Sequence, residues 1–129
     1  MKTDIKIYKS PFLGSNSGGT IRIEAPEFTH RSKATRIPHM ARIVIDYVPR
    51  ESCLDGDAIG EYMISFRDEE MSPEEAIHTI CKEIAEALEP MAITVSSNYS
   101  PRDGVAASPQ ARWQHPSTQQ PTQRIVGLN

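Results

Sequence analysis

The stretch MSPEEAIHTICKEIAEALEP, residues 71–90, decides the fold of this chain. Ser72 suits a helix N-cap, Pro73 suits the first helical position, and Glu75 follows at the position that a capping box requires. Apolar residues then recur at helical spacing until Pro90 ends the pattern. The apolar stripe consists of Ile77, Ile80, Cys81, Ile84, Ala85 and Leu88. The spacing predicts an amphipathic helix that packs on a core.

Glu74 stands in the first turn of this helix, near the edge of the buried stripe and at the positive end of the helix dipole. A carboxylate held there can accept two N–H donors from a guanine-like ring. The same residue is also explained as a first-turn acid that only complements the dipole. The spacing alone leaves both interpretations open.

Composition indicates one domain with a lean, aliphatic core, since 38% of the 129 residues are hydrophobic and 6% are aromatic. The net charge of −3, without a long basic run, argues against nucleic acid as the main partner. Cys53 and Cys81 have no metal-binding spacing, so we expect no metal. The N-terminus lacks a signal-like apolar segment and nothing approaches a membrane span, so we expect a cytoplasmic protein without a membrane partner.

Short apolar alternations stand before and after the helix and predict strands. Residues 40–49, MARIVIDYVP, give the clearest one, because every second side chain on one face is apolar and Pro49 ends the run. The side chains of this face are Ala41, Ile43, Ile45 and Tyr47. The other expected elements are a strand at 20–25, a helix at 58–69, a strand at 91–99 and a short strand at 105–107.

The chain divides into three predicted parts. Residues 1–19 form an N-terminal extension with a Gly/Ser/Asn loop, and residues 20–109 form the folded domain. Residues 110–129 are rich in Gln, Pro, Ser and Thr and have little apolar surface to bury. We expect them to be a polar C-terminal tail, ordered only if a neighbour holds it.

The order strand, strand, helix, helix, strand, strand is typical of an α+β domain. It predicts a four-stranded antiparallel sheet with both helices on one face. A sheet this short leaves its edges exposed, and pairing of edges between subunits is a common way to cover them. We therefore expect a ring-forming homo-oligomer.

Several short motifs now stand in a characteristic order around the Glu74 helix. They are PEFT (26–29), IDYVP (45–49), SFR (65–67) and SPRDG (100–104). In this order and near these spacings, the chain resembles the 7-cyano-7-deazaguanine reductase family, the nitrile reductases of queuosine biosynthesis. The resemblance covers roughly residues 21–109 and implies the tunnelling fold, which has the same ββααββ unit.

The resemblance also implies a site for a 7-deazaguanine base between subunits. In this family a Glu near the start of the second helix anchors the guanine edge, and Glu74, beside Pro73, matches that position. The segment after the second strand contributes to the base site as well. Leu54, Asp55 and Gly56 occupy it here.

The catalytic loop of the family differs in this chain. The family has Cys-Pro-x-Thr-Gly-Gln-Pro-Asp, where the Cys attacks the nitrile and the Asp supplies a proton. Residues 32–39 read SKATRIPH, so Ser32 stands at the nucleophile position and His39 at the proton-donor position. A serine hydroxyl needs an activating base, whereas a thiol is partly ionised near neutral pH.

The cofactor segment differs too. The family motif Glu-Ser-Lys-Ser-x-Lys becomes DGDAIG at residues 55–60, without either lysine. Binding the phosphates of NADPH requires cations or a donor-rich loop. We therefore expect no cofactor here, and nitrile reduction that is absent or very weak.

Three functions remain open from the sequence. The first is a protein that binds a 7-deazaguanine, guanine or pterin-like ring through Glu74 without reducing it. The second is an enzyme with altered chemistry on such a ring, in which His39 acts as a base for Ser32. The third is a structural or interaction protein, whose basic loop meets an acidic partner or phosphate or is simply solvated. The loop residues are His30, Arg31, Lys33, Arg36, His39 and Arg42.

Overall fold

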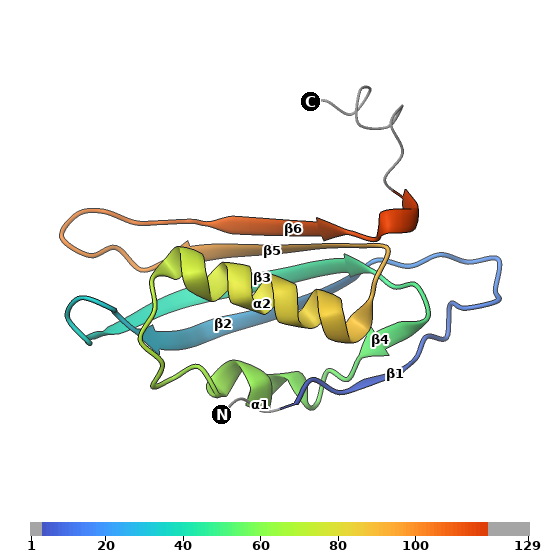
Figure 1. Cartoon of the computed structure of the whole chain (residues 1–129), viewed down its shortest axis with the longest axis horizontal. Helices are drawn as coiled ribbons and strands as arrows, with labels where there is room; N and C mark the ends of the chain where they lie inside the picture. Colours follow the sequence, from blue (N-terminus) through green and yellow to red (C-terminus); the bar gives the residue numbers. More distant parts are fainter. Residues whose placement is uncertain (1–3, 119–129) are drawn as a thin grey trace, which may run out of the picture.

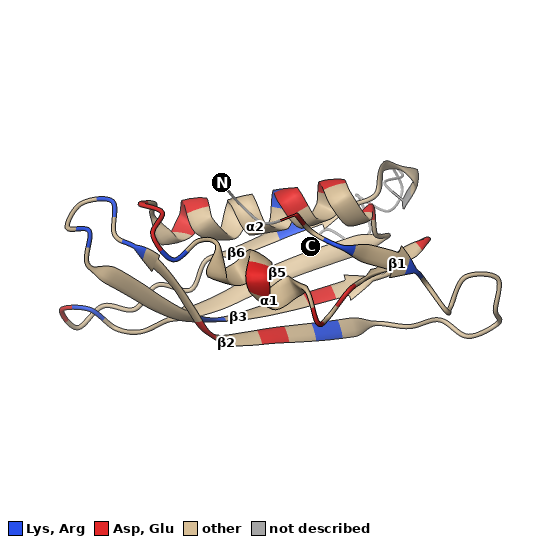
Figure 2. Ribbon diagram, turned by 90° about the horizontal axis from the view of Figure 1, so that it is seen from below, with Lys and Arg blue, Asp and Glu red and all other residues tan. Residues whose placement is uncertain are grey.

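A four-stranded antiparallel sheet forms the base of the structure, a computed structural model that describes residues 4–118 (Figure 1). The elements of this layer and its helices are β2 (Ile21–Arg31), β3 (Pro38–Val48), α1 (Ile59–Ile64), α2 (Pro73–Leu88), β5 (Ala92–Tyr99) and β6 (Gln110–Gln114). The strands lie in the order β2-β3-β5-β6, and both helices cover the same face (Figures 1 and 2). The predicted α+β class and the ββααββ order are therefore confirmed.

The helix α2 begins and ends as the sequence predicts. Ser72 Oγ accepts a hydrogen bond from the Glu75 amide at 3.1 Å, and Glu75 Oε1 accepts one from the Ser72 amide at 2.9 Å. These two bonds form the capping box. Glu89, with φ at 48°, ends the helix before Pro90. The stripe residues Ile77, Ile80, Cys81, Ile84, Ala85 and Leu88 are all buried.

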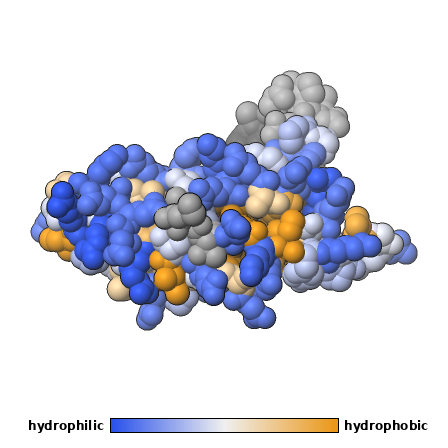
Figure 3. Space-filling view, turned by 60° about the horizontal axis from the view of Figure 1, so that its bottom comes forward, coloured by the Kyte–Doolittle hydropathy of each residue, from blue (hydrophilic) through white to orange (hydrophobic). Residues whose placement is uncertain are grey.

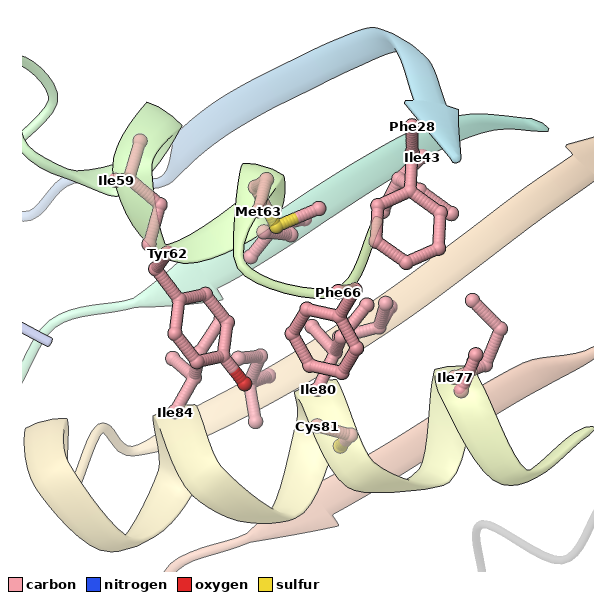
Figure 4. Packing of buried hydrophobic residues seen from close by; sticks show 14 of the residues in the cluster. Phe28, Ile43, Ile59, Tyr62, Met63, Phe66, Ile77, Ile80, Cys81 and Ile84 are labelled. Carbon is pink, nitrogen blue, oxygen red and sulfur yellow. The ribbon is translucent and has the colours of Figure 1, made fainter. Parts of the chain in front are cut away.

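The hydrophobic core lies between the helices and one face of the sheet. Phe66, in the turn after α1, has no exposed surface and joins the two layers (Figure 4). Its ring centroid lies 5.5 Å from that of Phe28 and 5.3 Å from that of Tyr62, both in edge-to-face geometry. Burying one large apolar side chain contributes roughly 1.5–3 kcal/mol. The inward residues of β3 are also buried, as predicted: Ala41, Ile43, Ile45 and Tyr47.

The fourth strand lies later in the chain than the sequence predicted. β6 pairs with β5, whereas Val105 makes only an isolated bridge to Arg102. Ala111 and Trp113 are partly buried and alternate with exposed polar residues. The prediction that a tail begins at residue 110 is wrong, because residues 110–114 form a strand. The Gln-rich composition of the segment makes this alternation difficult to recognise from the sequence. Residues 119–129 of the predicted tail lie outside the described residues.

The N-terminal extension contributes a strand of its own. β1 (Ile7–Lys9) pairs antiparallel with β4 (Ser52–Leu54) in a separate two-stranded sheet. The amide of Asp55 donates a hydrogen bond to the carbonyl of Lys6 at 2.9 Å. This pairing fixes the segment that leads into α1 and places Leu54 in the core at 3% exposure.

β2 is an edge strand with a bulge in its middle. Its register with β3 shifts between Ala25 and Phe28, so β2 accommodates one extra residue there. Beyond the bulge, Phe28 and His30 still face the core and are buried. β6 forms the other edge of the sheet. The ring-like homo-oligomer, which would cover these two edges, stays a prediction.

The surface that carries α1 and β1 is largely hydrophilic, with apolar side chains in several separate places (Figure 3). The large apolar residues exposed on the molecule as a whole are Ile7, Tyr8, Leu13, Ile37, Met40, Val48, Ile64 and Val105. None of the helices within residues 4–118 is long and apolar enough to span a membrane.

Candidate functional site

Ser32, His39 and Glu74 lie toward the same end of the sheet. β2 ends, β3 begins, β5 ends and α2 begins at this end, on the left of Figure 1. His30 pairs with His39 across β2 and β3, and Ala41 pairs with Tyr99 across β3 and β5. The sheet therefore places the loop of residues 32–37 beside the first turn of α2.

The loop of residues 32–37 is closed by its own backbone. The Ser32 amide donates to the Ile37 carbonyl at 2.8 Å, and the Arg36 amide donates to the Ser32 carbonyl at 2.9 Å. Ser32 Oγ accepts hydrogen bonds from the amides of Ala34 and Thr35 at 3.2 and 3.3 Å. Arg36 has φ at 64°, a left-handed conformation that favours glycine, the residue of the resembled family at this position. The hydroxyl of Ser32 thus acts as an acceptor that shapes the loop.

Basic residues of this end of the sheet form ion pairs with the acidic segment before α2 and with its first turn; Figure 2 shows the charged residues in blue and red along the ribbon. The backbone of Arg31 also bridges to this segment, since its amide donates to the Glu69 carbonyl at 2.9 Å. Exposed ion pairs contribute little individually, and two of the three involve the loop itself, while the third involves the last residue of β2. The pairs are Arg31–Asp68 at 3.5 Å, Lys33–Glu75 at 2.8 Å and Arg36–Glu70 at 3.1 Å. The cations of the predicted basic loop therefore already have acidic partners in the chain.

Glu74 differs from its neighbour Glu75. Lys33, and then the Ser72 amide, hold the pKa of the Glu75 carboxyl below its ordinary value. The side chain of Glu74 is exposed and makes no hydrogen bond or ion pair with another residue of 4–118. Glu74 therefore presents a free carboxylate at the N-terminus of α2, where the helix dipole favours negative charge.

A buried polar pair, His30 and Tyr99, lies beneath this end of the sheet. His30 has no exposed surface, and its Nδ1 lies 3.1 Å from the carbonyl oxygen of Arg31. Its Nε2 lies 2.8 Å from the hydroxyl oxygen of Tyr99. Burial, and then the neighbouring His39, lower the pKa of His30. Burial, and then the charge of Glu74, raise the pKa of Tyr99.

His39 stands beside this pair and is only partly buried. Its ring centroid lies 5.4 Å from that of His30 and 5.8 Å from that of Tyr99. Partial burial, and then the positive charge of Arg102, lower the pKa of His39. No hydrogen bond joins Ser32 and His39 in the described part of the chain. The geometry therefore provides no base in contact with the Ser32 hydroxyl.

The remaining predicted base-site residues lie elsewhere in the chain. Leu54 is a core residue whose amide donates to the Tyr47 hydroxyl at 2.9 Å. Asp55 Oδ1 accepts a hydrogen bond from the Asp57 amide at 3.0 Å and shapes the turn before α1. Gly56 lines a cleft of about 440 Å³ between β2 and α1. Pro73 and Glu74 are not among the residues that line this cleft.

The charged residues that line this cleft are mostly acidic. Arg67 is the only cation among the described residues that line it. Residues 55–60, at the position of the family's lysine motif, contain no cation. Phosphates bind where cations or a donor-rich loop face them, and here negative charge prevails. The carboxylates of the lining are Glu24, Glu27 and Asp57.

The sequence predicts His30 in a basic loop, whereas the structure buries it against Tyr99, a residue that no sequence motif indicates. His30 follows Phe28 by two residues, so the alternation of β2 places it on the inward face. The partner of a buried polar group on a strand is set by sheet pairing, and the two residues are 69 positions apart.

The fold and the site define a class of protein. A ββααββ domain with both helices on one face of the sheet corresponds to the tunnelling fold. The crystal structure of the archaeosine synthase QueF-Like in its apo form has the same fold. It superposes with a TM-score of 0.69 at 18% sequence identity, over 75% of this chain and 95% of that one.

The chain belongs to the QueF-like protein family, whose model matches residues 38–118. It is 30% identical over 118 residues to the NADPH-dependent 7-cyano-7-deazaguanine reductase of Thioalkalivibrio sulfidiphilus, covering 92% of this chain and 90% of that protein. The reductase of the same name from Gloeobacter violaceus is 33% identical over 98 residues, which cover 76% of this chain and 72% of the relative. Both of these relatives are named as reductases of 7-cyano-7-deazaguanine.

Proposed function

We propose that this chain binds a 7-deazaguanine- or guanine-type base, with Glu74 as the carboxylate that anchors the donor edge of the ring. Membership of the QueF-like family supports the class of ligand. Pro73 lies beside Glu74 and shapes the same first turn of α2. The proposed role is that of a base-binding protein related to queuosine or other 7-deazapurines.

The observation that carries this proposal is the free carboxylate of Glu74. Glu70 and Glu75 on either side of it are paired with Arg36 and Lys33. Glu74 makes no such pair within residues 4–118, although Lys33 of the loop pairs with Glu75, the next residue of the helix. An exposed carboxylate that remains available at a helix N-terminus suits a ligand that brings its own N–H donors.

We further propose that NADPH-dependent nitrile reduction is lost in this chain. Ser32 stands where the family has its nucleophilic Cys, and its hydroxyl accepts hydrogen bonds from loop amides. The segment at 55–60 has no cation for the cofactor phosphates. The alternative in which His39 activates Ser32 is less well supported, because the two side chains are not hydrogen-bonded in the described chain. The interaction-protein alternative is less well supported too, since the loop cations have internal partners.

We also propose that the complete base site forms in a ring-like homo-oligomer. Asp55 and Gly56 stand before α1, and Glu74 stands at the start of α2. In Figure 1 α2 begins at the left end of the sheet, whereas α1 begins near the middle of the molecule, on the side of β4. A base site that uses both segments therefore needs a second subunit, and the open edges β2 and β6 offer a way to pair with one.

The test is calorimetric titration with 7-cyano-7-deazaguanine, guanine and a pterin, after the mass of the protein has been measured by light scattering. We expect Glu74→Gln to bind the preferred ring about 10- to 150-fold more weakly, since a hydrogen bond to a charged group contributes about 1.5–3 kcal/mol. Glu86→Gln, an exposed change near the other end of the same helix, is the control and should bind like the unmodified protein. Equal affinity of the Glu74 and Glu86 variants would remove Glu74 from the site.

A further inference from the structure

We propose that β6 of one subunit pairs with β2 of a second copy in one defined register, with the partner subunit's Arg112 opposite Glu24 and the partner subunit's Trp113 opposite Ile23. The bulge that follows Ala25 marks the end of this pairing. This inference rests on the homo-oligomer proposed above and names the residues that form its interface.

The hydrophobic core is open at both edges of the sheet. At β2, the side chains of Ile21, Ile23 and Ala25 lie on the helix side and are only partly buried. At β6, Ala111 and Trp113 lie on the same side and are partly buried too. Trp113 also lines a hollow of about 170 Å³ between α2 and β6. A sheet that continues from β6 into the β2 strand of a second copy would bring these two half-buried apolar edges together.

The directions of the strands allow this continuation. All neighbours in the order β2-β3-β5-β6 are antiparallel, so β2 and β6 run in opposite directions. A second copy in the same orientation beside β6 therefore offers its β2 as a further antiparallel strand. The lengths also agree, because β6 has 5 residues and β2 pairs regularly over Ile21–Ala25 before its bulge.

The alternation of the two strands limits the possible registers. A slip by one residue would place Trp113 opposite a charged residue of the other face of β2. Three registers place Trp113 opposite an apolar residue on its own face of the sheet, which is Ile21, Ile23 or Ala25. The residue that then lies opposite Arg112, on the outer face, distinguishes these three registers.

Two of the three registers are unfavourable. With Trp113 opposite Ile21, Arg112 lies opposite Arg22, and like charges directly across a sheet are destabilising. The nearby carboxylate does not compensate, because Asp46 already pairs with Arg22 at 2.8 Å. With Trp113 one pair further along, Arg112 lies opposite Pro26, within the bulge of β2. Proline has no N–H to donate, and a bulge interrupts the ladder of hydrogen bonds.

The remaining register joins opposite charges on one face and apolar side chains on the other. The partner subunit's Arg112 lies opposite Glu24, whose carboxylate pairs with Arg42 and has lone pairs for a second donor. The partner subunit's Trp113 lies opposite Ile23, which lines the cleft between β2 and α1. Both are favourable cross-strand pairs. A second copy of the chain therefore covers the β2 side of this acidic cleft.

The experiment is disulfide cross-linking of the full chain after mild oxidation. The double variant Glu24→Cys with Arg112→Cys places two thiols directly opposite each other in the proposed register. Residues opposite each other on paired strands have Cα atoms about 4.5–5.5 Å apart, which a disulfide can bridge. Within one subunit, β3 and β5 separate β2 from β6 by roughly 14 Å, so the bridge can form only between subunits. We expect a ladder of covalent oligomers on a non-reducing gel.

The matched control is Arg22→Cys with Arg112→Cys, which tests the register shifted by two residues. All three replaced side chains are exposed, and the native thiols of Cys53 and Cys81 are buried, so neither folding nor side reactions obscure the comparison. The control should lose the ladder. Equal ladders in the two variants, or a ladder in the control alone, would overturn the register.

Light scattering on the unmodified protein separates this inference from the function proposed above. Assembled protein whose Glu24 and Arg112 cysteine variant gives no ladder would overturn the pairing of these edges and leave the oligomer to another interface. A monomeric mass at every concentration would overturn the proposed oligomer and this inference together. A cross-linked ladder in a protein that binds none of the titrated rings would overturn the base-binding role and support the register.

Discussion

The middle of α2 and its first turn contact the rest of the chain in different ways. In the middle, Ile80 and Ile84 have no exposed surface and pack on the sheet. At the first turn, Glu75 is exposed and paired with Lys33, and Glu74 is exposed without a pair in the described chain. Apolar contact thus fixes where the helix lies, while the charged end remains accessible. One helix separates the residues that stabilise the fold from Glu74, for which we propose a role in binding a ligand.

The largest effect that would sharpen this contrast is expected in the middle of the helix. Ile80→Ala removes a fully buried side chain and should lower the free energy of unfolding by about 2–5 kcal/mol. Ile37→Ala is the control, because this side chain is 52% exposed and its loss should change stability by less than about 0.5 kcal/mol. Chemical denaturation measures both. Equal effects at the two positions would mean that the core does not lie where the structure places it.

A smaller effect is expected from His30, which is buried at the end of the sheet where α2 begins. The pKa of His30 in the folded protein lies below its ordinary value of 6.5. As the pH falls, His30 therefore becomes protonated in the unfolded chain before it does so in the folded protein. Stability should therefore be constant above about pH 7 and decrease as the pH falls below about 6.5. His39 is shifted in the same direction and adds to the slope.

The measurement is the thermal midpoint as a function of pH. The double variant His30→Phe with Tyr99→Phe should flatten the decrease, since the titrating imidazole is gone and only His39 remains. A midpoint that rises on acidification would show that His30 is charged in the folded protein, and that the Tyr99 hydroxyl does not donate to it.

The smallest effect is expected in the loop that contacts the first turn of α2. Arg36 is held at φ 64° and pairs with Glu70. Arg36→Gly should be more stable than Arg36→Ala by about 1 kcal/mol, because only glycine adopts this backbone without a steric penalty. Both variants lose the same exposed ion pair, so their difference isolates the backbone. Denaturation midpoints that coincide would contradict a left-handed conformation at this position.

The parts of the fold that could be predicted from the sequence are those that depend on residues close together in the chain. The capping box of α2 and the alternation of β3 are local patterns, and both are confirmed. β6 was missed because Trp113 and Ala111 alternate with Gln and Arg in a segment whose overall composition is polar. The pairing of His30 with Tyr99 was missed for another reason, since it depends on how β2, β3 and β5 are placed side by side.

The site residues show the same division. Comparing positions with the family pattern selected Ser32, His39 and Glu74, and the structure gathers them at one end of the sheet. The comparison with the family pattern could not show that Ser32 Oγ accepts hydrogen bonds from loop amides. Nor could it show that Lys33 pairs with Glu75 rather than with Glu74. Ion pairs between exposed side chains depend on geometry of a few ångströms, which residue spacing does not specify.

The hydrogen bonds within the loop of residues 32–37 have a consequence for any atom at position 32. The amides of Ala34 and Thr35 point at the Ser32 side chain and create a small region of positive potential there. A negatively charged atom in that place would be stabilised by both N–H groups, just as an anion is stabilised in a backbone nest. The electrostatic environment that a nucleophile requires is thus a property of the loop backbone, and it does not depend on which side chain occupies the position.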